Sequence, residues 1–490
     1  MIKKIFFSVI FISVLFQMEM IANSEFDDFF LNRTFRIDFY HSGNAKEEHI
    51  SIDKLYLEGK WSGNKKSLIF PFKYGKYRYE IYSYPQNILK FSKGYDSYFA
   101  EYSTTQEAIN GVNKTCHETA LIPFPRRKFF FVIKKKDRKN IYHEIFKTKI
   151  DPRDRMISTE KKYGNAKIIN ILKSGDPEKC VDLAFIAEGY QASEFKKAKA
   201  DFMRAKEIFF SQEPYKSLRS RFNLYGIFKA SFNSGTDEPR QQIFKNTAVD
   251  TTFNSFNSPR YLLTESNKKL RDISSAVPYD AIIIMVNSKR YGGGGIFNLY
   301  CTFTIDNKQT PYLLLHEFGH SFSGLADEYY SSAVSYNDFY PPGIEPDEPN
   351  ITALLNPKNL KWRKLVTAGV KIPTPWRKTE FDRMNADFSK KRAKINRKIE
   401  ALIKKEASPD QISAARKELN DLINKKEIED KNFFLKSGNR GIIGAFEGAG
   451  YSSKGLYRSM TNCIMFTIGK KPYCKVCRSA VEEMIKYYSD

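Results

Sequence analysis

The stretch PYLLLHEFGHSF, at residues 311–322, combines an apolar helical pattern with two histidines four positions apart. Because an α-helix turns by about 100° per residue, His316 and His320 would lie on one helix face, one turn apart. Two imidazoles placed in this way can share one tetrahedral zinc ion, with a third protein ligand and a water in the remaining positions. Glu317 lies beside them, where its carboxylate can act as general base toward that water. The stretch therefore predicts the zinc helix of a metallopeptidase.

The alternative for this stretch is a buried helix with two ordinary core histidines. Histidine usage argues against it, because the chain has only 6 histidines among 490 residues and two of them fall in the motif. A metal site is therefore the preferred interpretation.

A third zinc ligand is expected in the stretch GLADEY, residues 324–329. Gly324 can turn the chain sharply where another residue would be strained. We favour Asp327 as the ligand, with Glu328 as the alternative, because a glycine followed by a ligand three residues later is the metzincin arrangement. The glycine lies four residues after His320, whereas the metzincin pattern has three, so one extra residue has to be absorbed before the turn.

Two further segments are expected near the metal. Residues 457–466 read YRSMTNCIMF and are predicted to form a methionine turn beneath it, through Met465 or alternatively Met460, although an ordinary core methionine fits as well. Tyr457 is expected to reach the oxyanion that forms when water attacks the scissile carbonyl. Upstream, the four glycines of YGGGGIFN, residues 291–298, permit close backbone approach, and residues 296–305 would then form an edge strand that pairs with an extended peptide substrate. A flexible loop is the alternative.

The chain is longer than one hydrophobic core usually organises, which predicts two domains. Residues 25–155 are expected to form an antiparallel β-sandwich, because alternating and aromatic-rich runs are separated by turn residues at short intervals. Residues 165–490 are expected to form an α/β metzincin-like catalytic domain. Within it, the continuous apolar runs at 181–186 and 281–286 predict buried strands, and apolar residues at helical spacing predict a helix from Phe195 to Phe209.

Residues 378–430 differ from the rest of the catalytic domain in being dense in Lys, Arg and Glu. Apolar residues keep to one helical face in each half, and Ser408 to Gln411 resembles a capping box with proline at the first helical position. We predict a charged helical hairpin inserted into the catalytic domain. A solvated structural segment is preferred to a partner-binding one.

Residues 1–24 are predicted to be a secretory signal peptide. A basic start at Lys3 and Lys4 precedes an almost wholly apolar run at 5–16, and small residues follow at Ala22 and Ser24. A membrane anchor is the alternative, but the run is short for a bilayer span, which takes about 20 residues. We therefore expect a secreted or periplasmic bacterial protein with no stable membrane insertion after signal cleavage.

Composition limits the remaining function classes. With 41% hydrophobic and 15% aromatic residues, the chain has ample material for folded cores, which excludes global disorder. The net charge of +24 is scattered rather than gathered in one patch, so solubility explains it better than an anionic partner surface. No nucleic-acid-binding motif is present, and nucleic acid is not expected as a partner. The oligomeric state is left open.

Six cysteines permit disulfides in an exported chain. Cys463, Cys474 and Cys477 lie close together, which suggests a local disulfide. The spacing of Cys474 and Cys477 also suits a structural metal, but no second pair accompanies them, and the disulfide is preferred.

Several of these segments together resemble the IgA-peptidase family of zinc metallopeptidases, HExxH-type enzymes of the metzincin clan. The similar segments are residues 36–55, 292–300, 316–330, 348–352 with Lys361 and Trp362, and 446–451. The resemblance implies a catalytic zinc on His316 and His320, Glu317 as catalytic acid and base, and an N-terminal β-sandwich. The family name does not imply that this chain cuts immunoglobulin A.

The sequence thus predicts a secreted endopeptidase that hydrolyses peptide bonds in protein or peptide substrates with zinc-activated water and Glu317 as general base. One alternative is a non-catalytic extracellular protein that binds glycoprotein or cell wall, although a pure binder has no need of Glu317. Another is a zinc amidase that acts on cell-wall peptides.

Overall fold

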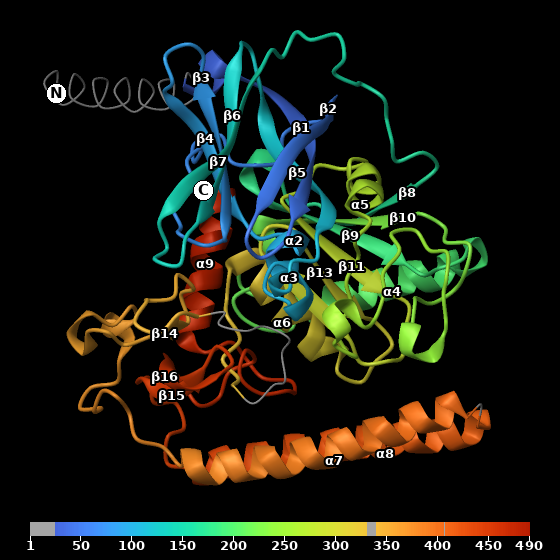
Figure 1. The fold of residues 1–490 in the computed structure, drawn as a ribbon, viewed down its shortest axis with the longest axis vertical. Helices are drawn as coiled ribbons and strands as arrows, with labels where there is room; N and C mark the ends of the chain where they lie inside the picture. Colours follow the sequence, from blue (N-terminus) through green and yellow to red (C-terminus); the bar gives the residue numbers. More distant parts are fainter. Residues whose placement is uncertain (1–24, 331–339, 406) are drawn as a thin grey trace, which may run out of the picture.

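The computed structural model describes residues 25–330, 340–405 and 407–490, so the predicted signal peptide lies outside the described residues. A β-rich N-terminal domain sits against a mixed α/β C-terminal domain (Figure 1). The predicted two-domain architecture, with a β-rich first part and an α/β second part, is therefore confirmed.

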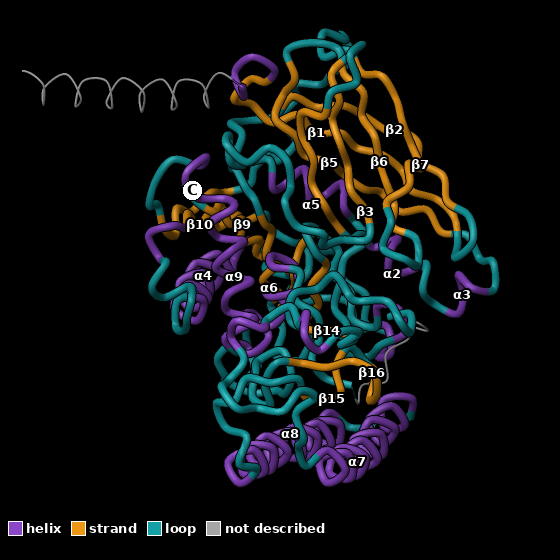
Figure 2. Tube along the Cα trace, turned by 90° about the vertical axis from the view of Figure 1, so that its left-hand side faces the viewer, coloured by secondary structure: helices purple, strands orange, loops and turns teal. Residues whose placement is uncertain are grey.

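The N-terminal domain consists of two antiparallel sheets (Figure 2). The first has the order β2-β1-β5 and the second β4-β3-β6-β7. Their bounds are β1 Phe30–Gly43, β2 Glu48–Leu57, β3 Tyr77–Ser83, β4 Leu89–Tyr95, β5 Lys114–Pro125, β6 Phe129–Lys136 and β7 Tyr142–Ile150. The short helices α2 (Tyr98–Tyr102) and α3 (Gln106–Ile109) lie between β4 and β5. Alternation along β1 sends Phe35, Ile37 and Phe39 into a core that they share with aromatic residues of β3 and β6.

The polar residues of β1 join the two domains. Arg36 is fully buried and binds Asp38 on its own strand, and it also reaches Asp272 of the C-terminal domain, with Nη1 2.8 Å from Oδ1. Burial opposes the ionised form of Asp38, but hydrogen bonds and charge from His117 and Arg36 lower its pKa to about 2. A satisfied ion pair therefore fixes the docking of the sheet on α5 (Asn267–Ser274).

The C-terminal domain is built on a six-stranded sheet with the order β12-β13-β11-β9-β10-β8. The four inner strands run parallel, and the edge strands β8 and β12 are antiparallel to their neighbours. Their bounds are β8 Lys167–Leu172, β9 Val181–Glu188, β10 Phe222–Phe228, β11 Ala281–Val286, β12 Gly293–Ile296 and β13 Tyr300–Thr304.

Helices cover both faces of this sheet, which explains the continuous apolar runs of β9 and β11. Leu183 and Phe185 share one core with α4 (Phe195–Phe209), α6 (Thr310–Ser323) and α9 (Lys475–Ser489). Ala184 and Ile186 point to the other face and pack with α5. The predicted helix from Phe195 to Phe209 and the two predicted buried strands are confirmed.

The edge strand lies earlier than the sequence predicted. Residues 296–305 were expected at the edge, but β13 lies between β12 and β11 inside the sheet. The glycine run itself forms the edge strand β12, because its missing side chains let it lie directly against α6. A methyl group on Gly295 would stand 2.3 Å from the Glu317 carbonyl oxygen.

Two long helices follow α6 in the chain, α7 (Lys378–Lys404) and α8 (Pro409–Lys436), and they lie side by side (Figures 1 and 2). Ser408 caps α8 through a capping box with Gln411, as predicted. A small sheet of β14 (Ile351–Thr352), β16 (Ser452–Arg458) and β15 (Phe446–Ala449) completes the domain. Among the described residues, no helix is both long and apolar enough to cross a membrane.

His41 gives the N-terminal domain a pH-dependent stability. Its buried ring contacts Glu118 and Glu48 at 3.1 and 3.0 Å. Burial lowers its pKa, but the two carboxylates override burial and raise the pKa from 6.5 to about 9. Since the folded pKa exceeds the unfolded one, this stabilisation is complete below pH 6.5 and is lost as the pH rises through 9.

We therefore expect His41→Gln to reduce the free energy of unfolding by roughly 3 kcal/mol at pH 6 and by much less at pH 9.5. Urea denaturation of both proteins at the two pH values measures this difference. An equal loss at both would contradict the charged form of His41.

Candidate active site

Helix α6 brings the motif histidines to the middle of the molecule. Pro311 stands in its first turn, where a missing N–H is tolerated. The helix ends at Gly324, whose φ of 60° is left-handed, and the Gly324 N–H donates to the His320 carbonyl. The three residues between His320 and Gly324 are all helical, so the extra residue relative to the metzincin pattern is taken up in the helix before the chain reverses.

After this reversal, Asp327 comes back beside the histidines. Its Oδ1 atom lies 3.1 Å from Nε2 of His316 and 3.2 Å from Nε2 of His320. The two Nε2 atoms are 3.2 Å apart. The structure thus brings one ligand atom from each of three predicted site residues, His316, His320 and Asp327, to one point. His316 and Asp327 are buried, and the side chain of His320 is 15% exposed.

Backbone carbonyls determine which imidazole nitrogens face that point. Nδ1 of His316 lies 3.1 Å from the Ile464 oxygen, and Nδ1 of His320 lies 2.6 Å from the Leu325 oxygen. A carbonyl can only accept, so each Nδ1 carries the proton and donates it. Each Nε2 then directs its lone pair toward Asp327, as in metal-binding histidines oriented by an outer hydrogen bond.

Three electron pairs that converge in a buried place require a cation between them. Asp327 Oδ1 has no hydrogen-bond donor, while its Oδ2 accepts from the Tyr451 hydroxyl. Tetrahedral ligands at about 2.0 Å from zinc lie about 3.3 Å apart, which matches the observed separations. Burial disfavours positive charge on an imidazole, yet the Asp327 carboxylate raises the pKa of His320 to about 9, so these surroundings stabilise a cation at the His320 ring. The residues therefore fit a divalent metal ion.

Glu317 lies next to this point, between α6 and β12. Its side chain is 7% exposed, and a methyl group on Gly293 would meet its Cγ and Oε1 at 3.0 and 3.1 Å. Burial raises the pKa of Glu317 above its usual range, and the nearby Asp327 carboxylate adds to that rise. The carboxyl group therefore holds a proton more readily than a solvent-exposed glutamate does.

A cleft of about 520 Å³ opens over the three converging atoms. Its walls come from both domains. The C-terminal domain contributes His316, Glu317, His320, Asp327 and the strand β12, and the N-terminal domain contributes residues that include Tyr74, Lys76, Lys136 and Arg138. A ligand that fills this cleft would therefore contact both domains.

Comparison with known families agrees with this geometry. Residues 169–485 match the family model described as IgA Peptidase M64, and residues 25–147 match the model described as Peptidase M64 N-terminus. The chain belongs to the IgA peptidase M64 family. The M64 family consists of metallopeptidases, so the protein is a peptide-bond hydrolase with a protein or peptide substrate. No curated protein matches the chain.

Two residues of this M64 peptidase that the sequence analysis did not single out lie close to the metal point. Nη2 of Arg260 donates to the Tyr329 hydroxyl at 3.3 Å, and both residues line the cleft. Tyr457, which was expected near the oxyanion, lies instead in β16 opposite Glu447 and is not among the cleft-lining residues. Tyr329 stands two positions after Asp327 and could have been suspected, whereas nothing in the sequence marks Arg260.

Met465 packs against α6 of the peptidase. It is fully buried, and a methyl group on Gly319 would stand 3.2 Å from its sulfur. Met460 is only partly buried and packs at the margin of the same core. The segment that contains Met465 also binds α6 by a hydrogen bond, because the carbonyl of the neighbouring Ile464 accepts from Nδ1 of His316.

Glu328, the rival third ligand, points away from the histidines. Its backbone N–H donates to the Met465 carbonyl, and its carboxylate meets the thiols of Cys474 and Cys477. The predicted local disulfide is wrong for this structure, because all six cysteines carry free thiols. Nearby cysteine positions in the sequence do not fix whether the sulfurs bond to each other.

The contact between β12 and α6 yields a test. Gly295→Ala would drive a methyl group into the Glu317 carbonyl oxygen, at 2.3 Å. We expect a loss of about 1–3 kcal/mol in the free energy of unfolding, as for other overpacked cores, together with loss of peptidase activity. Gly59→Ala is the matched control, since a methyl group there meets nothing within 4 Å. Urea denaturation and a peptide-cleavage assay measure both. Full activity in Gly295→Ala would contradict the close contact.

Proposed function

We propose that this peptidase is a zinc-dependent endopeptidase in which His316, His320 and Asp327 hold the zinc ion and Glu317 is the general base. The supporting observation is the convergence of two Nε2 atoms and one carboxylate oxygen, at separations of 3.1 and 3.2 Å, on the floor of a cleft. We prefer Asp327 to Glu328 as third ligand, because Glu328 faces the cysteines.

Zinc bound to these residues would polarise the scissile carbonyl and lower the pKa of an attacking water. Glu317 takes the proton of that water on its carboxylate and delivers it to the leaving amine. Its raised pKa suits both the uptake and the release of the proton. Arg260 and Tyr329 lie where they can donate hydrogen bonds to the carbonyl oxygen as negative charge develops on it.

The edge strand β12 would hold the substrate backbone. Its only partner strand in the described part of the sheet is β13, while the neighbouring loop reaches it at Gly293 alone, through the Leu262 N–H. An extended peptide can add itself to such an edge by main-chain hydrogen bonds. The glycines let β12 lie directly against Glu317, so a peptide added to this edge would lie close to the general base. A cleft with walls from two domains suits a chain interior rather than a free terminus.

Several finer features belong to the same proposal. We infer a metzincin-like catalytic domain at 165–490, with Met465 in the methionine turn, after a β-sandwich domain at 25–155. The pair α7 and α8 is proposed to be an insertion in the catalytic domain. Export to the periplasm or the exterior is proposed from residues 1–24 alone. An amidase acting on cell-wall peptides would use the same site, and cleavage mapping by mass spectrometry on peptide libraries and cell-wall fragments separates the two.

Glu317→Gln tests the general base. We expect kcat/KM to fall by about 10²–10⁴-fold, which is the usual contribution of acid–base catalysis, while the zinc content measured by mass spectrometry stays unchanged. Glu348→Gln is the control, because Glu348 lines the same cleft and binds Tyr340; it should retain activity. Undiminished hydrolysis by Glu317→Gln would refute this mechanism.

Tyr451→Phe tests the third ligand. Removing the hydroxyl that donates to Asp327 Oδ2 frees the carboxylate to rotate. We expect zinc affinity, measured by competition with a chelator, to fall by about 10–100-fold. Tyr457→Phe, on the adjacent strand and outside the cleft lining, should leave zinc affinity unchanged. Equal affinities in all three proteins would argue against Asp327 as a ligand.

A further inference from the structure

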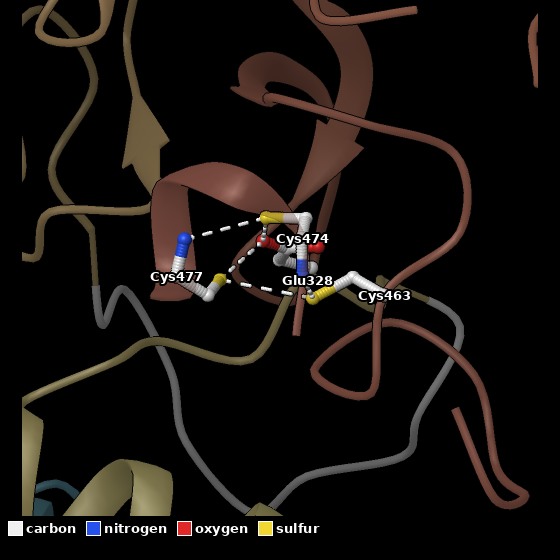
Figure 3. A group of neighbouring side chains, drawn as sticks. All are labelled: Glu328, Cys463, Cys474 and Cys477. Atoms are coloured by element: carbon white, nitrogen blue, oxygen red, sulfur yellow. Dashed lines mark hydrogen bonds between the residues drawn. The ribbon is translucent and has the colours of Figure 1, made fainter. Parts of the chain in front are cut away.

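A second group of metal-binding side chains lies behind the active site. Glu328, Cys463, Cys474 and Cys477 are all buried, and their ligand atoms lie within 4.8 Å of one another (Figure 3). They come from three separate segments: the loop after α6, the loop after β16, and the beginning of α9. None of these residues takes part in the proposed catalytic chemistry.

The separations suit a shared tetrahedral ion better than a disulfide. The sulfurs of Cys463 and Cys477 are 3.7 Å apart, and Glu328 Oε1 lies 3.2 Å from Cys477 Sγ and 3.9 Å from Cys474 Sγ. Sulfurs bound to one zinc at about 2.3 Å lie about 3.8 Å apart, whereas a disulfide requires about 2.05 Å. Three thiols also cannot all pair with each other.

The backbone around the cysteines supports thiolate ligands. Cys474 is the N-cap of α9, and its sulfur accepts from the Cys477 N–H at 3.4 Å. Cys463 Sγ accepts from the Cys474 N–H at 3.3 Å. Ser459 Oγ lies 3.2 Å from Cys474 Sγ. Hydrogen bonds to ligand atoms are the outer contacts that orient metal ligands and spread their charge.

The charges around the cluster also favour a bound cation. Glu328 is completely buried and its Oε2 has no hydrogen-bond partner among the described residues, which is costly for a carboxyl group. Arg458, also completely buried, lies within electrostatic reach of Glu328 and Cys463, with its guanidinium 3.7 Å from the Phe466 ring centre. A divalent ion with three thiolates and one carboxylate carries a charge of −2, which Arg458 partly offsets.

We propose that Glu328, Cys463, Cys474 and Cys477 form a second zinc site, structural in role. On binding, each of the three thiols releases a proton and forms one sulfur–zinc bond, and Glu328 supplies a carboxylate oxygen. Soft thiolate ligands select zinc over hard cations. Four protein ligands leave no position for water, which is the property of a structural rather than a catalytic site.

This site supports the catalytic one through two short connections. Glu328 follows Asp327 directly, and Cys463 precedes Ile464, whose carbonyl orients His316. An ion bound by Glu328 and Cys463 therefore fixes the positions of their neighbours. One neighbour is Asp327, the proposed third zinc ligand, and the other is Ile464, whose carbonyl orients His316. The second site positions the catalytic ligands without touching substrate.

A second cluster of possible metal ligands differs from the cysteine cluster in how its charge is neutralised. Asp38, Asp53 and His117 also converge, but Arg36 binds Asp38 and Lys268 binds Asp53. Their charges are already neutralised by protein cations. The cysteine cluster has no comparable cation bound directly to its ligand atoms among the described residues.

The test uses the full chain with the catalytic histidines removed. We expect two zinc ions per wild-type chain and one in the double variant His316→Ala/His320→Ala, measured by elemental mass spectrometry. Replacing that ion with cobalt should give sulfur-to-cobalt charge-transfer absorption. Adding Cys477→Ser to the double variant should abolish that absorption.

Because this triple variant can fail to fold, alkylation of the folded double variant supplies a second readout. Cys463, Cys474 and Cys477 should react only after a chelator is added, whereas Cys116, Cys180 and Cys301 should show no such dependence.

The outcomes separate this site from the catalytic proposal. One zinc in the wild type that disappears in the folded double variant would overturn the second site and leave the first intact. One zinc that survives in the double variant, with thiolate absorption of cobalt, would support the second site and count against the first. A disulfide among the three cysteines, found by peptide mapping of the protein as purified, would also overturn the proposal.

Discussion

Two hydrogen bonds from imidazole Nδ1 atoms to backbone carbonyls underlie the whole site. They fix the tautomer and the rotation of His316 and His320, so that both Nε2 lone pairs face Asp327. One carbonyl is that of Leu325, in the turn after the helix. The other is that of Ile464, in a loop 148 positions after His316. The place where the three ligand atoms converge is thus determined by the packing of α6, the turn after it and the loop around Ile464, and not by the helix alone.

The N-terminal domain takes part in this packing as a wall of the cleft. The Arg36–Asp272 ion pair docks its first sheet on α5, and the turn near Tyr74 then lies against Gly324, where a methyl group would meet the Tyr74 ring at 3.1 Å. The same glycine reverses the chain toward Asp327. The cleft wall from the N-terminal domain and the chain reversal that brings Asp327 back therefore meet at one contact, between Tyr74 and Gly324.

Local patterns in the sequence predicted the elements that bury apolar residues with a clear period. The strands β9 and β11 and the helix α4 follow the expected residues, because hydrophobic periodicity is set by the element itself. The motif spacing also predicted that His316 and His320 share a face. What the sequence could not supply was the direction in which neighbouring residues point once the chain leaves the helix. Asp327 and Glu328 are adjacent and chemically similar, yet one faces imidazoles and the other thiols. The glycine strand was misplaced because glycine has a low strand propensity, and only its contact with α6 favours an extended backbone there.

The long reach from His316 to Ile464 has a consequence for biosynthesis. During translation α6 is made well before the residues that support it, since Tyr451 and Ile464 follow Asp327 and His316 by 124 and 148 positions, beyond α7 and α8. A nascent or prematurely terminated polypeptide that stops short of β16 has the ligands without the scaffold that aims them. Such a fragment therefore lacks the groups that orient His316 and hold the Asp327 carboxylate.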